Sequence, residues 1–150
     1  MSQTSPHFGF ILADCARLQR RYFDRRAKGT GLSRAQWSVL AQLSRHEGLK
    51  QAELAELLEL QPISLARHID RLEAQGCVER RPDPQDRRAR RLFLTDKAGP
   101  LLDQLQCLGQ EVREQALAGL DEEQRRLVHA ALSQVRDNLS HSLTRLEEGH

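Results

Sequence analysis

The chain has few of the residues on which disulfide-linked and membrane-bound proteins depend. Its 150 residues include three cysteines, one tryptophan, one tyrosine and one methionine. Cys15, Cys77 and Cys107 are odd in number and widely spaced, which favours neither a disulfide framework nor a zinc knuckle. No apolar run approaches the ~20 residues of a membrane span, and the N-terminus lacks the basic-then-apolar pattern of a signal peptide. We therefore expect a cytoplasmic protein with no membrane contact and with reduced thiols.

Catalytic motifs are missing as well. No GxSxG, HExxH or glycine-rich phosphate loop occurs, and the six histidines are scattered, with no pair at i and i+4. The sequence leaves open a histidine and carboxylate site that assembles only in three dimensions. We expect a protein that is not an enzyme and that has no metal and no cofactor.

Charge is abundant, at 29% of residues beside 39% hydrophobic residues, a balance typical of a globular domain. The net charge of +2 is unevenly distributed along the chain. Residues 1–60 and residues 61–97 each carry nine Lys/Arg against six Asp/Glu, whereas residues 98–150 carry five against nine. Basic first and middle parts beside an acidic last part indicate a surface for a polyanion.

Apolar periodicity and capping residues predict three short helices between residues 33 and 75, after a longer first helix that ends near Lys28. Ser33 is expected to cap the second helix, Pro62 to begin the fourth and Gly76 to stop it. Three short helices in succession are typical of a helix-turn-helix lobe. The residues expected to face inward on the first three helices are Phe8, Ile11, Cys15, Leu18, Tyr22, Trp37, Leu40, Leu43, Leu54, Leu57 and Leu58.

The fourth helix has two contrasting faces. Leu65, Ile69 and Leu72 form the stripe that we expect to be buried. The opposite face contains hydrogen-bond donors and cations and no acid, which suits a DNA major groove, where base edges and phosphates are mostly acceptors. A face that is merely solvated is the alternative. The outer residues are Ser64, Arg67, His68, Arg71 and Gln75.

A hairpin is predicted after this helix, because the β-prone runs CVERR and RRLFLT flank the tip sequence PDPQDRRA. Residues 80–91 hold six arginines against Asp83 and Asp86, a local charge of +4. Such a cationic wing can enter a minor groove, where narrow stretches concentrate negative potential. We expect Asp86 to hold the Arg88 guanidinium by a charge-assisted hydrogen bond and so to aim it at DNA.

These segments carry a family resemblance. In chain order, LSRAQWSVLAQL, QAELAELL and QPISLARHIDRLEAQGCVERRPDPQDRRARRLFLTDKAG resemble the MarR family of winged-helix regulators, most closely its SlyA-like branch. The resemblance implies a homodimer that binds double-stranded DNA at a pseudo-palindromic operator, most simply as a repressor, and is released by a small aromatic or acidic ligand. Gln61 and Ile63 depart from the family pattern, which commonly has a Ser or Thr cap and a small polar residue there. With the helix and wing faces, the candidate DNA-binding residues are Ser64, Arg67, His68, Arg71, Asp86, Arg87, Arg88 and Arg90.

Two further helices are expected to build the dimer. Thr95 is expected to cap a helix over residues 96–120, and DEEQ at residues 121–124 resembles a capping box that begins a last helix reaching about Glu147. The apolar seam of this last helix is too long for a small winged lobe to cover, so we expect terminal helices of two chains to share a bundle. A monomer that folds these helices back on itself is the alternative. The seam residues are Leu132, Val135, Leu139, Leu143 and Leu146.

The expected fold class is mainly α (α+β). A winged helix-turn-helix lobe with a small β-hairpin wing, residues 32–97, lies between long dimerisation helices in residues 1–31 and 98–150. In the SlyA-like branch the positions of Arg17 and Trp37 border a pocket, so the resemblance implies an aromatic carboxylate that pairs with the guanidinium and stacks on the indole. A core tryptophan and a solvated arginine are the alternative.

Two other functions remain open. One is a redox-sensing regulator of the same fold with Cys15 as the sensor, although the position of Cys15 on the apolar stripe favours a buried, inert thiol. The other is a helical adapter dimer that does not bind DNA, which would leave the cationic wing unexplained.

Overall fold

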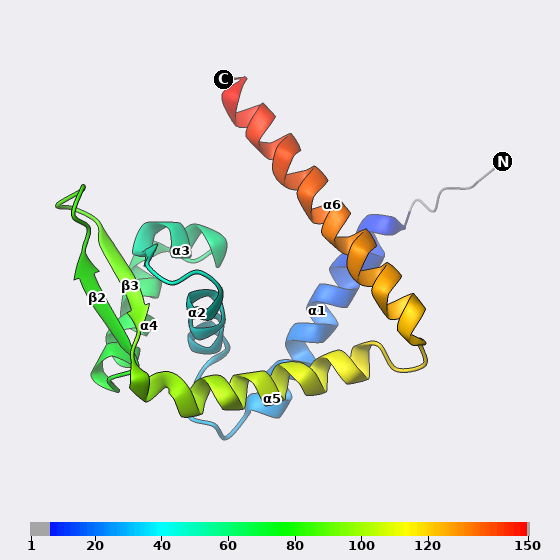
Figure 1. The fold of residues 1–150 in the computed structure, drawn as a ribbon, viewed down its shortest axis with the longest axis horizontal. Helices are drawn as coiled ribbons and strands as arrows, with labels where there is room; N and C mark the ends of the chain where they lie inside the picture. The colour runs from blue at the N-terminus through cyan, green and yellow to red at the C-terminus, as the bar shows by residue number, and fades with distance from the viewer. Residues whose placement is uncertain (1–6, 150) are drawn as a thin grey trace. The chain divides into compact units, whose positions relative to one another are not determined.

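The protein is mainly helical, with one small sheet (Figure 1). A computed structural model describes residues 7–149. The mainly α fold class with a β-hairpin wing is confirmed. In chain order the elements are α1 (Phe8–Ala27), α2 (Arg34–Arg45), β1 (Leu49–Lys50), α3 (Gln51–Leu57), α4 (Pro62–Ala74), β2 (Val78–Pro82), β3 (Arg90–Leu94), the 3-10 turn η1 (Asp96–Ala98), α5 (Gly99–Ala116) and α6 (Glu122–Glu148).

The chain divides into two compact units, one ending at Val112 and the other beginning at Arg113. The first unit contains the helix-turn-helix and the sheet, and the second contains the end of α5 and all of α6. Among the described residues, no helix is both long enough and apolar enough to cross a membrane.

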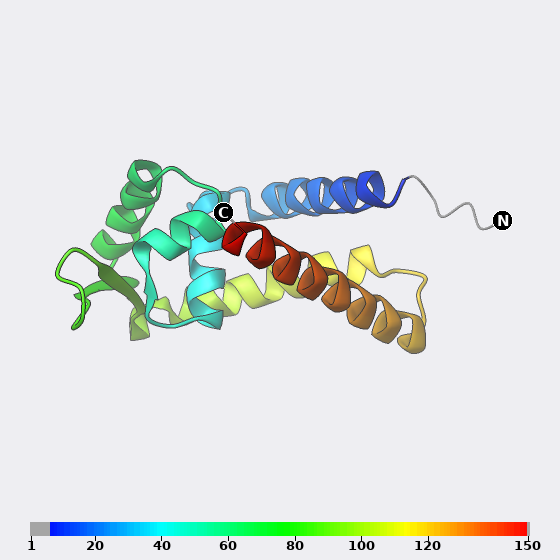
Figure 2. The ribbon, with the colours of Figure 1, turned by 90° about the horizontal axis from the view of Figure 1, so that it is seen from above.

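The sheet is antiparallel, with the strand order β1-β3-β2. The predicted hairpin pairs β2 with β3 from Val78 opposite Leu94 to Pro82 opposite Arg90. The third strand, β1, pairs Leu49 with Leu92 and was not predicted, because two residues are too few to show strand alternation. The hairpin lies beside α4 and projects beyond the helices of the lobe (Figures 1 and 2).

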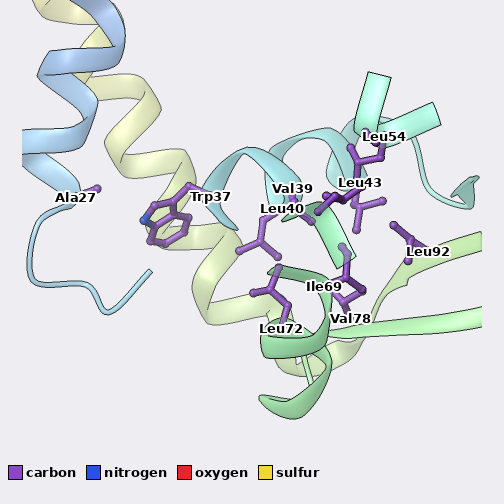
Figure 3. Close-up of a cluster of buried hydrophobic side chains, with 12 residues drawn as sticks. Ala27, Trp37, Val39, Leu40, Leu43, Leu54, Ile69, Leu72, Val78 and Leu92 are labelled. Carbon is purple, nitrogen blue, oxygen red and sulfur yellow. The ribbon is translucent and has the colours of Figure 1, made fainter. Parts of the chain in front are cut away.

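The core lies where α2, α4 and the sheet meet, and Figure 3 shows its side chains converging from these elements. Leu65, Ile69 and Leu72 are fully buried, as predicted for the inner stripe of α4. Leu40 and Leu92 meet them from α2 and β3. Each buried aliphatic side chain of this kind contributes about 1.5–3 kcal/mol, so the core fixes the rotation of α4 about its axis.

Helix caps fall close to the expected positions. Ser33 and Gln36 form a complete capping box at α2, and Asp121 and Gln124 form another at α6. Gly76 follows α4 with φ of 77°, a left-handed conformation that suits glycine at a helix end. Thr95 does not cap the fifth helix with its side chain, because its hydroxyl donates to the carbonyl oxygen of Gly76 instead.

Two predictions of burial are wrong. Leu57 is 53% exposed, since α3 ends there and turns only Leu54 and Ala55 fully inward. The apolar stripe of α1 is also largely exposed, and only its last turns, with Phe23 and Ala27, reach the core. The stripe extends for several turns beyond the small lobe, so the lobe does not cover it. Its exposed members are Phe8, Ile11, Cys15 and Leu18.

In the second unit, Arg125 fixes the beginning of α6. Its guanidinium lies 3.2 Å from a carboxylate oxygen of Glu114 and donates to the carbonyl oxygens of Leu117 and Leu120. None of the 27 residues of α6 is buried. The predicted seam is therefore open to solvent in the single chain, at Leu132, Leu139, Leu143 and Leu146.

Candidate nucleic-acid interface

The outer face of α4 presents cations that no other group holds. Arg67 and Arg71 are exposed, and neither guanidinium has a hydrogen bond or ion pair with another residue of the described chain. Ser64 and His68 lie on the next ridge and are half-buried. Within residues 7–149 the Nδ1 atom of His68 is buried without a partner, which leaves Nε2 as the nitrogen of His68 that can meet a ligand.

Arg80 forms ion pairs with the two acids that flank this face. Its guanidinium lies 2.8 Å from Asp70 and 3.0 Å from Glu73, and it also donates to the carbonyl oxygen of Ala66 and the side chain of Gln51. The Arg80 side chain is only 19% exposed. It therefore ties β2 to α3 and α4 and neutralises two carboxylates of α4 itself, rather than serving as a free cation of the wing.

Both aspartates of the wing tip build the loop between β2 and β3. The Asp83 carboxylate accepts from the backbone N–H of Gln85 at 2.8 Å, and the Asp86 carboxylate accepts from the backbone N–H of Arg88 at 3.0 Å. These are Asx turns, which order a loop through short local hydrogen bonds. The expectation that Asp86 holds the Arg88 guanidinium is wrong, because Asp86 holds the Arg88 backbone instead.

Asp83 also forms ion pairs at the base of the wing. Its side chain is 1% exposed, and one carboxylate oxygen lies 3.2 Å from Nε of Arg91 and 3.7 Å from Nζ of Lys50. Arg91 donates in turn to the carbonyl oxygen of Gly48 at 3.0 Å. The hydrogen bond from Gln85, followed by the charges of Arg91 and Lys50, lowers the pKa of the Asp83 carboxyl below its ordinary value. Asp83 therefore links the wing loop to β1 and β3.

The six arginines from residue 80 to residue 91 thus divide into two sets. Arg80 and Arg91 are structural, and Arg81 lies 4.0 Å from the centre of the Phe93 ring and 3.2 Å from Glu79. The second set is exposed and has no side-chain partner among the described residues; it consists of Arg87, Arg88 and Arg90. The charge of +4 counted over residues 80–91 overstates the positive charge that the wing can present to a ligand. Three of its six arginines already interact with other groups of the chain.

Sequence patterns missed three important residues. No local sequence pattern shows that Asp83 or Arg80 stabilises the lobe, because their ion-pair partners lie on other elements. Ile63 was noted only as a departure from the family pattern, yet it is 66% exposed in the first turn of α4. Its position four residues before Arg67 was the available signal, because residues at i and i+4 of a helix share a face.

The structure does not bring Arg17 and Trp37 together. Arg17 is exposed on α1 and pairs with Asp14 at 3.5 Å. Trp37 is 1% exposed, packs edge-on against Phe23, and donates from its indole N–H to the Thr30 hydroxyl at 3.2 Å. Arg17 precedes Phe23 by six residues, about 9 Å of helix rise. In the described chain the indole therefore has no open face on which a ligand could stack.

The cysteines differ from the expectation in one respect. Cys15 is exposed rather than buried, as is Cys107, whereas Cys77 is buried. No described hydrogen bond joins the Cys15 thiol to a cation, and a reactive thiol needs such a setting as well as exposure. Exposure alone gives the redox alternative no specific support.

Known proteins resemble this chain over its helix-turn-helix and well beyond it. Residues 30–89 match the model of the MarR family. The HTH-type transcriptional regulator YybA of Bacillus subtilis (strain 168) is 30% identical over 123 residues, 82% of each chain. The chain belongs to the MarR family. Members of the MarR family are transcriptional regulators rather than enzymes, so the expectation of a non-enzyme is confirmed and the adapter alternative loses its support.

Solved structures of MarR-type regulators share the fold. The crystal structure of transcriptional regulator PA3341 is 38% identical, with a TM-score of 0.76 over 89% of this chain and 98% of that chain. The crystal structure of the transcriptional regulator SlyA is 27% identical, with a TM-score of 0.71 over 87% of this chain and 92% of that chain. The comparisons support the MarR family without favouring the SlyA-like branch within it.

Two matched substitutions test the role of Asp83. Asp83→Asn and Asp86→Asn each remove one negative charge and keep an oxygen that can accept the Asx-turn hydrogen bond. We expect Asp83→Asn to weaken DNA binding, because only Asp83 holds Arg91 and Lys50 at the wing base. Asp86→Asn should bind DNA as well as the wild type or better. Gel-shift titrations at one salt concentration distinguish the two variants. Equal DNA affinities of both variants would contradict the role of Asp83 at the base of the wing.

The ion pairs of Asp83 with Arg91 and Lys50 should also make the stability of the protein depend on pH. The direction of this dependence follows from the lowered pKa of Asp83. Because its pKa is depressed in the folded protein, Asp83 contributes stability above the unfolded value of about 3.9, and this contribution is lost as pH falls through the folded value. We therefore expect thermal unfolding of wild type between pH 7 and pH 3 to show a steeper loss in the acid range than Asp83→Asn. Identical pH profiles would show that the carboxylate does not act through its charge.

Proposed function

We propose that this chain is a homodimeric repressor that binds a pseudo-palindromic operator in the cytoplasm. The observation that carries the proposal is the pairing of an acid-free, unpartnered cationic face on α4 with an ordered wing that presents three unpartnered arginines. Intramolecular ion pairs with Arg80 and Arg91 hold the nearby carboxylates of Asp70, Glu73 and Asp83. The functional division is a DNA-binding lobe, residues 32–97, between dimerisation helices in residues 1–31 and 98–150.

In this proposal α4 enters the major groove. Arg67 is the residue best suited to read a base, because an exposed guanidinium without a partner can donate two parallel hydrogen bonds to guanine. Ser64 and His68 lie on the neighbouring ridge of α4 and add hydrogen-bond donors on shorter side chains. Arg71 lies further along the helix and reaches the phosphate backbone. Base contacts set the sequence preference, and phosphate contacts set affinity and register.

The wing supplies the second contact, in the adjacent minor groove. Arg87, Arg88 and Arg90 are exposed around a loop that Asp83 and Asp86 hold by Asx turns. An ordered loop loses less conformational entropy when it binds, so its arginines contribute more of their electrostatic attraction to affinity. Asp86 belongs to this site as a loop-building residue.

Dimerisation supplies the second half of the operator contact. The exposed leucines of α6 form an apolar stripe that a single chain leaves in water, and a twofold partner would cover it. A twofold dimer places its two recognition helices about 34 Å apart, one turn of DNA.

Selection of genomic DNA fragments by the purified protein tests the proposal. The enriched fragments should share an inverted repeat with half-sites about one helical turn apart, and gel-shifts should show one dimer bound to each repeat. A reporter gene placed behind the selected operator should be transcribed more strongly when the protein is deleted. A fragment pool without a shared repeat would contradict sequence-specific binding, and a reporter that loses expression would contradict repression.

The effector proposal rests on Arg17. We expect an aromatic carboxylate such as salicylate to bind there at millimolar concentration, because a carboxylate can replace Asp14 as the partner of the exposed guanidinium. A ligand that binds one spacing of the two α4 helices of the dimer better than another shifts the dimer toward that spacing, so salicylate should weaken operator binding. Arg17→Ala should abolish this response, and Arg21→Ala, which removes an exposed arginine from the same helix, should retain it. Gel-shifts and titration calorimetry measure both effects. An unchanged salicylate response in Arg17→Ala would exclude Arg17 from the effector site.

A further inference from the structure

Ile63 is an exposed aliphatic side chain in the first turn of α4. It is 66% exposed and is absent from the residues that pack against the core, although its neighbours Leu60 and Leu65 both belong there. Among the described residues of the winged lobe, Leu57 is the other large aliphatic side chain with comparable exposure. Ile63 therefore contributes little to the stability of the lobe.

Helix propensity does not explain Ile63 either. A β-branched residue loses rotamer freedom in a helix, and a polar or alanine residue at this exposed position would favour α4 as well or better. Pro62 already begins the helix, and Gln61 makes no side-chain cap, so the first turn does not require an apolar residue for capping. The interactions within the described chain therefore give no reason for an aliphatic residue at this position.

The ridge that contains Ile63 shows where a contact outside the chain would lie. Ile63, Arg67 and Arg71 follow one another at steps of four residues, and all three are exposed. Residues at this spacing are neighbours on one helix face, with Cβ atoms about 5–6 Å apart. The most exposed ridge of the recognition helix thus consists of one aliphatic group followed by two unpartnered guanidinium groups.

We propose that Ile63 contacts the C5-methyl group of a thymine in each operator half-site. Thymine is the base that presents a methyl group in the major groove, and apolar side chains recognise it there. A Cβ spacing of about 5–6 Å against a base-pair rise of about 3.4 Å places this thymine one or two base pairs from the base that Arg67 contacts. This inference rests on the proposed function and adds to it one specificity-determining residue.

Removal of the methyl group from DNA gives a direct test. In the selected operator, each thymine is replaced in turn by deoxyuridine, which differs from thymidine by the methyl group alone, and by 5-bromodeoxyuridine, whose bromine has similar bulk. At one position, deoxyuridine should weaken wild-type binding by about fourfold per half-site, the effect of one methyl group losing apolar contact. Bromodeoxyuridine at that position should restore affinity.

The matched protein variants assign the effect to Ile63. Ile63→Ala should bind the unmodified operator as weakly as wild type binds the deoxyuridine operator, and should not distinguish thymidine from deoxyuridine. Ile63→Val retains a branched aliphatic side chain and should still distinguish them. Because Ile63 is exposed, both variants should keep the wild-type circular dichroism spectrum and melting temperature.

The outcomes separate this inference from the function on which it rests. If wild type selects no DNA sequence, the proposed function fails and the inference fails with it. If wild type selects an operator but no thymine position responds to deoxyuridine, the inference alone is overturned. It is overturned equally if Ile63→Ala remains as sensitive to deoxyuridine as wild type.

Discussion

Leu139→Glu is expected to convert the protein into a monomer that no longer binds its operator. Leu139 is 55% exposed in the middle of the apolar stripe of α6, which the proposed dimer covers. An uncompensated carboxylate in such an interface costs about 3–5 kcal/mol, and twofold symmetry places two of them there. This total is comparable with the whole association free energy of a micromolar dimer, about 8 kcal/mol. Light scattering measures the mass, and gel-shift titration measures operator affinity.

His141→Glu is the matched control for this substitution. It introduces the same charge on the same helix, but two residues further on, about 200° around the axis from Leu139. His141 is exposed, and its variant should remain dimeric and bind DNA. A Leu139→Glu protein that stays dimeric and binds its operator normally would show that the α6 stripe does not form the interface.

Arg67→Ala is expected to lower operator affinity by about 1–3 kcal/mol per half-site, because one bidentate contact to a base is lost. Binding to random-sequence DNA should fall much less, since nonspecific binding depends on phosphate contacts that the other arginines still make. Stability should not change, because Arg67 has no hydrogen bond or ion pair with another residue of the described chain. Competition gel-shifts with operator and random duplexes measure the two affinities side by side.

Two further variants separate charge from geometry at this site. Arg67→Lys keeps the positive charge but cannot make a planar bidentate contact, so it should lose most of the specific affinity and keep the nonspecific affinity. Arg88→Ala removes a wing cation and should weaken binding to both kinds of DNA. If Arg67→Ala weakened operator and random DNA equally, Arg67 would be a phosphate contact rather than a base contact.

The parts of the fold that the sequence predicted are those set by local periodicity. The inner stripe of α4, the cap at Ser33, the capping box at Asp121 and the glycine after α4 all depend on residues within one or two helical turns. The exposed cations of α4 also follow from the position of its buried stripe, because burial of one helix face places the other in solvent.

The features that the sequence missed depend on partners that are distant in the chain. Arg80 is 29 residues from Gln51, and Arg91 is 43 residues from Gly48, so no local pattern marks either arginine as structural. Thr95 likewise bonds across 19 residues to Gly76 instead of capping its own helix. The wing looked more highly charged in sequence than it is in the structure for this reason.

The engagement of Arg80, Arg81 and Arg91 has a consequence for how binding responds to salt. Arginines that already hold carboxylates or carbonyl groups displace few of the cations condensed on DNA. The unpartnered arginines of the proposed interface are Arg67, Arg71, Arg87, Arg88 and Arg90, which gives about ten for a dimer. The logarithm of affinity should then fall with the logarithm of salt concentration with a slope no steeper than about −9. Counting the three engaged arginines as well would give about −14, so the folded protein should tolerate salt better than its sequence charge indicates.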